Sequence, residues 1–196
     1  ITGGLGYIGT ELCKIYSGIS WNNEIIVIDN RFISERVNQL RNWNMNFIQG
    51  DILDKNLITN YCKDADIVHH LAGVTDVPRV KSESNQDHDK KIKLVAEEGT
   101  QNILDAISDK CKIIMPSTHV VYEGIEKVKN DILEDEETSP VLSYGQSKDF
   151  NEKQLKASGK NYIILRLGSV YGYSTDTARI DIMPNFFSKM ASQNGT

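Results

Sequence analysis

Glycines close to the start of the chain constrain its fold more than any other feature. Residues 2–9 read Thr-Gly-Gly-Leu-Gly-Tyr-Ile-Gly, and an amphipathic stretch follows at once. The spacing of Gly3, Gly6 and Gly9 suits a tight turn, a close backbone approach and close packing of a helix on a strand. Because the first amides of a helix attract anions, such a turn can hold a dinucleotide pyrophosphate. The sequence therefore predicts a strand, a glycine turn and a helix over residues 7–17.

An acidic residue ends the next apolar run. Residues 24–29 read Glu-Ile-Ile-Val-Ile-Asp, which is typical of a buried parallel strand. Asp29 lies about 20 residues beyond Gly9, where a carboxylate can accept hydrogen bonds from an adenosine ribose. Its charge would repel a 2′-phosphate and so favours NAD over NADP, although Arg31 nearby weakens that preference. An aspartate that only caps a turn is the alternative interpretation.

Apolar runs and helical repeats alternate along the rest of the chain. Further strands are expected at 45–49, 66–71, 112–116 and 162–166, and further helices at 34–43, 54–62, about 85–108, 143–158 and 183–196, with a polar stretch at 75–87. This alternation predicts an α/β fold with a doubly wound parallel sheet, the Rossmann fold, as one NAD-binding domain over residues 1–196. Only Ile1 and Thr2 precede the glycine turn, so we expect a fold that is truncated at both ends.

A phenol and an ammonium lie one turn apart on the predicted helix 143–158. Residues 144–148 read Tyr-Gly-Gln-Ser-Lys, which places Tyr144 and Lys148 on one helical face. A free tyrosine has a pKa near 10, and an adjacent ammonium favours its phenolate. Tyr144 could then take a proton from a substrate hydroxyl while Lys148 holds a nicotinamide ribose. The alternative is an exposed amphipathic helix face.

A third hydroxyl group is expected beside this pair. Ser117 and Thr118 follow the predicted strand 112–116, and parallel sheets bind ligands at the carboxyl ends of their strands. We select Thr118 as the group that contacts the substrate oxygen, with a hydroxyl satisfied within a turn as the alternative. Together with the glycine turn, these residues predict redox chemistry at a carbon that bears a hydroxyl.

Composition narrows the class of protein further. With a net charge of −5 the chain offers no basic surface for nucleic acid, and no apolar run approaches the ~18 residues of a membrane span. Cys13, Cys62 and Cys111 are odd in number and far apart, so we expect buried thiols rather than disulfides or a metal site. No metal is predicted, and a soluble, cytoplasmic protein is expected.

Motifs along the whole chain resemble one known family, the extended short-chain dehydrogenases/reductases. More narrowly, the chain is similar to the NAD-dependent epimerase/dehydratase group that modifies nucleotide sugars. The matching segments are residues 2–9, Asp29-Asn30, Gly50-Asp51-Ile52, His70-Leu71-Ala72-Gly73, Gly99-Thr100-x-Asn102-Ile103-Leu104, Ser117-Thr118-x-x-Val121-Tyr122, Tyr144-x-x-x-Lys148 and Leu165-Arg166-x-x-x-Val170-Tyr171-Gly172.

The resemblance implies a set of site residues. The catalytic set is Thr118, Tyr144 and Lys148, and the substrate contacts are Thr118 and Ser169. The cofactor contacts are Gly3, Gly6, Tyr7, Ile8, Gly9, Asp29, Asn30, Arg31, Asp51, Ile52, Leu71, Ala72, Gly73, Tyr144, Lys148 and Gly168. It also implies a C-terminal substrate lobe that begins near residues 172–196 and is mostly absent from this chain.

Three departures from the family pattern matter. Ala96 stands where an active-site asparagine is usual, and Ser169 stands where an asparagine usually touches the substrate. His119 and Val120 follow Thr118, whereas sugar dehydratases of this group have Asp-Glu there. Because Val120 cannot move a proton, a 4,6-dehydratase is disfavoured. For His119 we expect a structural or exposed role.

The leading hypothesis is an NAD-dependent epimerase, or a related oxidoreductase, that acts on a hydroxyl of a nucleotide sugar. Two alternatives stay open: an NAD-dependent dehydrogenase or reductase of a small hydroxyl compound, and a non-catalytic NAD-binding sensor. The resemblance also allows a homodimer through the predicted helices 85–108 and 143–158.

Overall fold

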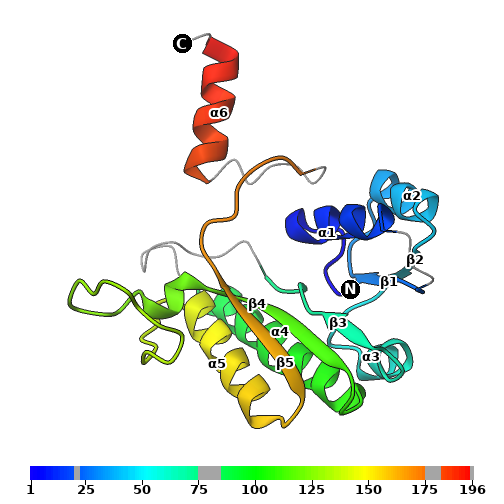
Figure 1. The fold of residues 1–196 in the computed structure, drawn as a ribbon, viewed down its shortest axis with the longest axis horizontal. Helices are drawn as coiled ribbons and strands as arrows, with labels where there is room; N and C mark the ends of the chain where they lie inside the picture. Colours follow the sequence, from blue (N-terminus) through cyan, green and yellow to red (C-terminus); the bar gives the residue numbers. More distant parts are fainter. Residues whose placement is uncertain (20–22, 75–84, 175–181, 195–196) are drawn as a thin grey trace. The chain divides into compact units, whose positions relative to one another are not determined.

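Parallel strand pairing occurs in both of the compact units into which the described residues divide. The computed structural model describes residues 1–19, 23–74, 85–174 and 182–194. The first unit comprises Ile1–Asp51 and Gly168–Thr196, and the second comprises Ile52–Leu167. Figure 1 labels the helices and strands of both units. The assignment of the whole chain to one domain stays a prediction.

The first unit contains a short parallel sheet. Strands β1 (Ile26–Asp29) and β2 (Asn46–Gln49) pair in parallel over their whole length. Thr2 forms an isolated parallel bridge with Ile28, so the start of the chain runs alongside β1. The expected strand before the glycine turn is therefore represented by this single bridge.

Helices pack onto this sheet through a small apolar core. Helix α1 (Tyr7–Ser17) follows the glycine turn, and α2 (Ser34–Asn42) connects β1 to β2. The cluster of buried core residues comprises Leu5, Cys13, Val27, Val37, Leu40 and Met45. The unit also contains α6 (Met183–Asn194), whose apolar residues Phe186 and Phe187 are largely exposed.

The second unit contains a parallel sheet with the strand order β3-β4-β5. Its strands are β3 (Ile67–His69), β4 (Lys112–Thr118) and β5 (Asn161–Leu167). Strand β4 lies in the centre and pairs with β5 from Lys112 opposite Asn161 to Thr118 opposite Leu167. The carboxyl end of β4 thus carries both hydroxyl residues singled out from the sequence.

Among its described residues, three helices and a short 3-10 turn complete the second unit. The helices are α3 (Lys55–Cys62), α4 (Gln86–Ala106) and α5 (Ser143–Ala157), and the turn η2 spans His119–Tyr122. Figure 1 shows α4 and α5 side by side, and the two helices pack against each other. Because η2 begins directly after β4, it fixes the direction of the chain beyond Thr118.

The predicted alternation of strands and helices is confirmed, with bounds that differ by a few residues. The sequence pattern placed Ser34 as a helix cap, but Ile33 is the capping residue and Ser34 the first helical one. The turn η2 was not predicted. Most of the polar stretch at 75–87 and part of the predicted substrate lobe, residues 175–181, lie outside the described residues.

The predicted buried thiols are observed. Cys13, Cys62 and Cys111 are all free and buried. Burial raises the pKa of Cys13 to about 11 and also raises the pKa values of the other two thiols. Within the described ranges, no group of three or more acidic, histidine or cysteine side chains is arranged to hold a metal. None of the described helices is both long enough and apolar enough to span a membrane.

Candidate active site

The glycine turn adopts a conformation that depends on its glycines. Gly3 has a φ of 68°, a left-handed conformation that glycine adopts readily, and its amide donates to the carbonyl of Ile28 at 2.7 Å. A Cβ added to Gly9 would overlap the Gly3 carbonyl and lie 2.7 Å from the Cα of Gly4. Any side chain at Gly9 would therefore push α1 away from the turn.

Helix α1 begins without a capping side chain. Its N-cap is Gly6, and there is no acidic residue in the first turn. The start of α1, at Tyr7 and Ile8, thus has no side-chain cap at Gly6 and no carboxylate in its own first turn that would repel an anion. This arrangement fits the pyrophosphate of a dinucleotide, which binds helix starts of this kind.

Asp29 is the last residue of β1, as the sequence predicts, and the structure places it against the glycine turn. Its Oδ2 accepts from the amide of Leu5 at 3.0 Å, and its Oδ1 accepts from the amide of Arg31 at 3.0 Å. The guanidinium of Arg31 adds an ion pair at 3.2 Å. The turn-capping role is therefore real, but a carboxylate has about four acceptor sites, so it can still accept from a ribose hydroxyl.

Other predicted cofactor residues of the first unit also come together. Asn30 Nδ2 donates to Asp51 Oδ2 at 3.2 Å, just beyond the carboxyl ends of β1 and β2. Tyr7 turns its hydroxyl to the carbonyl of Gly172, and Asn185 Nδ2 donates to that hydroxyl at 3.2 Å. The side chain of Tyr7 is thus committed to this segment, which leaves its backbone amide as the group that could bind a phosphate.

Ile52 is held by helix α4. A Cβ added to Gly99 would lie 2.7 Å from Ile52 Cγ1, so glycine is needed for this close packing. Asn102 donates to the carbonyls of Ile52 and Leu53 at 3.0 and 3.3 Å. No role was predicted for Asn102, yet it fixes the backbone at Ile52, a predicted cofactor contact.

Tyr144 and Lys148 lie on the first turns of α5. Lys148 Nζ lies 6.0 Å from the centroid of the Tyr144 ring. The same Nζ donates to the carbonyl of Pro116 on β4 at 2.9 Å. Burial of this ammonium lowers the pKa of Lys148 from 10.5 to about 8. The structure therefore holds a positive charge near the phenol and anchors it to the strand that carries Thr118.

The two hydroxyl residues at the end of β4 have different partners. Ser117 is buried and donates to Glu152 Oε1 at 2.5 Å. Thr118 Oγ1 accepts from the amide of Val120 at 3.3 Å and so caps η2, which matches the turn interpretation. Because a hydroxyl both donates and accepts, the proton of Thr118 can still be donated to a substrate oxygen.

Two histidines near these residues have different environments. His70 is buried, its Nε2 lies 3.1 Å from Thr100 Oγ1, and no role was predicted for it. Burial, and then the charge of Lys148, lowers the pKa of His70 to about 3, so it is neutral at physiological pH. His119 is exposed, as expected, and its Nδ1 lies 3.2 Å from the carbonyl of Leu167.

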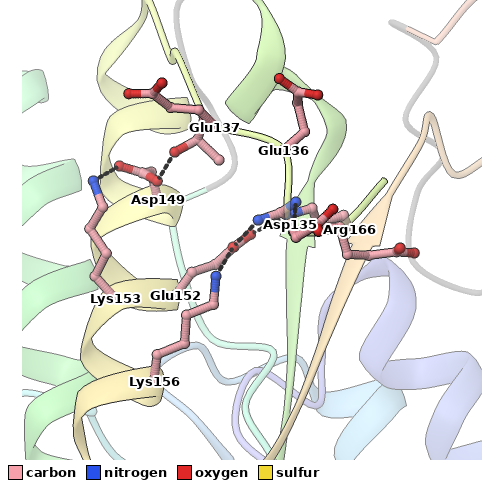
Figure 2. A pocket seen from close by; sticks show the side chains of 10 residues that line it. Asp135, Glu136, Glu137, Asp149, Glu152, Lys153, Lys156 and Arg166 are labelled. Atoms are coloured by element: carbon pink, nitrogen blue, oxygen red, sulfur yellow. Dashed lines mark hydrogen bonds and ion pairs between the residues drawn. The ribbon is translucent and has the colours of Figure 1, made fainter. Parts of the chain in front are cut away.

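A buried ion pair between Glu152 and Arg166, next to Ser117, was not predicted from the sequence. Glu152 is 1% exposed, and Arg166 binds it through Nε at 2.9 Å and Nη2 at 2.6 Å. Figure 2 shows Arg166 and Lys156 directed at Glu152, in a hollow that residues 134–138 also line. The only signal available was the spacing of Glu152, which lies one helical turn beyond Lys148.

The remaining predicted residues are more accessible. Leu71, Ala72 and Gly73 follow β3 in the second unit, whereas Gly168 and Ser169 are exposed in the first. Among the described residues, a Cβ added at Gly73 or Gly168 would meet no atom within 4 Å. Packing in this structure therefore does not require glycine at either position, and their contacts with a cofactor stay predictions.

A glycine turn followed by a helix, with an acid at the end of the next strand of an α/β fold, is typical of the class of dinucleotide-binding proteins. The chain belongs to the NAD dependent epimerase/dehydratase family, whose pattern it matches over residues 1–195. This match confirms the family predicted from the sequence motifs.

Individual relatives carry several related activities. The chain is 29% identical over 193 residues to a dTDP-D-glucose 4,6-dehydratase from Dictyostelium discoideum, a match that covers 88% of this chain and 43% of that protein. It is 28% identical over 185 residues to a UDP-glucose 4-epimerase from Mycoplasma genitalium, which covers 88% of this chain and 52% of that protein.

A solved structure supports the fold. The UDP-glucose 4-epimerase from Brucella ovis, crystallised in complex with NAD, is 28% identical and superposes with a TM-score of 0.70 over 89% of this chain and 53% of that one. The chain thus spans about half the length of the relatives that it matches. The likeness confirms the predicted Rossmann fold.

Proposed function

We propose that this chain is the NAD-binding part of an epimerase, or related oxidoreductase, that acts on a hydroxyl of a nucleotide sugar. The family supports NAD as the cofactor, and the relatives named for dTDP and UDP sugars support the substrate class. In this proposal residues 1–196 form one Rossmann domain, and the substrate lobe begins near residues 172–196.

The residues of the first unit fit NAD. The uncapped start of α1 would bind the pyrophosphate, and Asp29 would accept from the adenosine ribose while opposing a 2′-phosphate. NAD bound there would supply a site that accepts a hydride from the substrate carbon and can return it. The proton that leaves the substrate hydroxyl must then be taken by a group of the protein.

Tyr144 is the group that takes this proton. The observation that carries the proposal is the ammonium of Lys148, 6.0 Å from the Tyr144 ring centroid and held by the Pro116 carbonyl at 2.9 Å. This charge stabilises a phenolate, which is a competent base for a sugar hydroxyl. Thr118, at the end of β4, would donate to the same substrate oxygen.

The residues after Thr118 favour an epimerase over a dehydratase. His119 is exposed and contacts Leu167, and Val120 has no group that can transfer a proton. A 4,6-dehydratase needs an acid and a base at these positions, by the family resemblance. One relative is nevertheless a dehydratase, so identification of the reaction product must distinguish the two activities.

The direct test uses the full-length protein that carries this chain. It is incubated with NAD⁺ and a panel of UDP and dTDP sugars, and the products are separated by chromatography. We expect an epimer without net NADH for wild type, and a loss of roughly 10²-fold or more in turnover for Tyr144→Phe with NAD binding unchanged. Net NADH would indicate a dehydrogenase. No turnover by wild type on any sugar, despite NAD binding, would favour the sensor.

A second test uses the lowered pKa of Lys148. If its ammonium is required, turnover should fall as the pH rises through about 8, because Lys148 then loses its proton. Lys148→Arg keeps a charge that does not titrate below about pH 12, so the decline near pH 8 should disappear even if the maximum rate is lower. A decline that persists unchanged in Lys148→Arg would assign it to another group.

A further inference from the structure

Glu152 joins three elements around the Tyr–Lys pair. It lies on α5, it is 1% exposed, and its Oε1 accepts from Ser117 Oγ of β4 at 2.5 Å. Arg166 of β5 binds both of its carboxylate oxygens, at 2.9 and 2.6 Å. A paired, fully hydrogen-bonded carboxylate of this kind resists movement, because each separation would leave a charge buried without a partner.

The network extends from Arg166 to the chain beyond Thr118. Arg166 Nη1 donates to the hydroxyl of Tyr122 at the end of η2, and to the carbonyl of Glu134 at 2.9 Å. Tyr122 in turn donates to the carbonyl of Leu133 at 3.0 Å. One ion pair thus holds β4, η2 and residues 133–134 against α5.

Glu152 also completes a two-point attachment of α5 to β4. Lys148 and Glu152 lie one helical turn apart, and they bind consecutive residues of the strand, the carbonyl of Pro116 and the hydroxyl of Ser117. These are the last two residues before Thr118. Two attachments fix the position of a helix along a strand, whereas one attachment allows it to pivot or slide.

We propose that Glu152 is a positioning residue that sets Tyr144 and Lys148 in register with Thr118, a role that rests on the proposed function of these three residues. Glu152 contacts none of the reacting groups directly. It acts through Ser117, next to Thr118, and through the helix that carries Tyr144. Since a shift of about 1 Å can cost roughly 10²-fold in rate, this attachment should affect the chemical step more than binding.

The first experiment measures kcat, KM and NAD affinity in the full-length protein. Ser117→Ala removes one attachment and leaves the Arg166–Glu152 pair intact, so it should fold. We expect kcat to fall roughly tenfold, with KM and NAD affinity changed less than about twofold. Glu152→Ala should lower kcat further. Glu152→Gln should have a higher kcat than Glu152→Ala, because its amide oxygen can still accept from Ser117.

The matched control is Lys153→Gln. Lys153 is the next residue on α5 and pairs with Asp149 at 2.6 Å, but its side chain is 68% exposed. The Lys153→Gln substitution should leave kcat unchanged. If Ser117→Ala and Glu152→Gln also keep the wild-type kcat, or if kcat, KM and NAD affinity all fall together in Ser117→Ala, the positioning role is wrong.

A second measurement needs no substrate. The absorbance of the Tyr144 phenolate is followed against pH as the difference between each protein and the same protein with Tyr144→Phe. We expect the midpoint to rise in Ser117→Ala, because the phenol moves with α5 while the ammonium of Lys148 stays bound to the Pro116 carbonyl of β4. A rise without turnover on any sugar would retain the positioning role and reject the proposed reaction; an unchanged midpoint would reject the positioning role itself.

Discussion

The two units hold their candidate site residues by different means. In the first unit, main-chain amides and the absence of side chains shape the glycine turn, and a single carboxylate, Asp29, braces it through the amide of Leu5. In the second unit, buried charged side chains hold α5 against β4, through Lys148 and Glu152. A cradle for phosphates needs close backbone approach, whereas a base needs a defined charge beside it.

This difference determines how each region should fail. A glycine turn fails when an added side chain finds no space, so its defects are local and steric. A buried charge network fails when one partner is removed, because the remaining charge stays desolvated. Substitutions in the turn and in the network should therefore have distinguishable effects.

The largest effect is expected from Arg166→Met. Burial alone would raise the pKa of Glu152, but hydrogen bonds from Arg166 and Ser117 outweigh it and hold this pKa below its ordinary value. Without Arg166 the carboxylate loses its main partner, so the free energy of unfolding should fall by about 3–5 kcal/mol. Urea denaturation at neutral pH measures this change in the free energy of unfolding.

Two further variants sharpen this prediction. Arg166→Met combined with Glu152→Leu should regain much of the lost stability, since no buried charge is then unpaired. Lys153→Gln breaks a more exposed pair and should cost less than about 1 kcal/mol. A cost for Arg166→Met as small as that of Lys153→Gln would show that the buried network is not the main support.

Gly9→Ala should have the next largest effect. The added methyl group would overlap the Gly3 carbonyl and crowd the Cα of Gly4, so the free energy of unfolding should fall by about 1–3 kcal/mol. NAD affinity, measured by calorimetry, should fall with it because the turn must open.

Gly18→Ala is the matched control at the other end of α1. Gly18 has a φ of −85°, and an added Cβ would lie at an ordinary 3.6 Å from the Ile15 carbonyl. This substitution should leave NAD affinity unchanged. Equal losses in the two variants would mean that α1 stability, rather than the turn, governs binding.

The smallest effect should appear as a pH dependence. His70 stays neutral in the folded protein down to about pH 3, whereas the unfolded chain takes up a proton near pH 6.5. Between pH 6.5 and pH 5.5 the free energy of unfolding should therefore fall by about 1 kcal/mol because of this residue. His70→Asn should show a shallower slope than wild type over this range, and equal slopes would contradict the buried, neutral histidine.

The sequence predicted best where local chemistry dictates the backbone. Glycine spacing and amphipathic periodicity located α1, from Tyr7 to Ser17, and the acid that ends the next apolar run located Asp29 at the end of β1. A parallel sheet then brings the carboxyl end of β4 to α5, which explains why Thr118, Tyr144 and Lys148 could be proposed together.

Long-range side-chain partners could not be predicted in the same way. Glu152 and Arg166 are 14 residues apart and lie on different elements, so nothing in the local pattern distinguishes their pair from exposed charges. His70 was read only as part of a motif, because its burial against Thr100 depends on how α4 packs. Residue types suggest such contacts, but only packing selects among them.

The inaccessible thiols give each unit its own reporter of opening. Cys13 lies in the core of the first unit, and Cys62 and Cys111 are buried in the second. Thiolates react with alkylating reagents, whereas these protonated, enclosed sulfurs must first reach solvent. Alkylation rates measured by mass spectrometry would thus report local opening of the first unit separately from that of the second. No label has to be added to the protein.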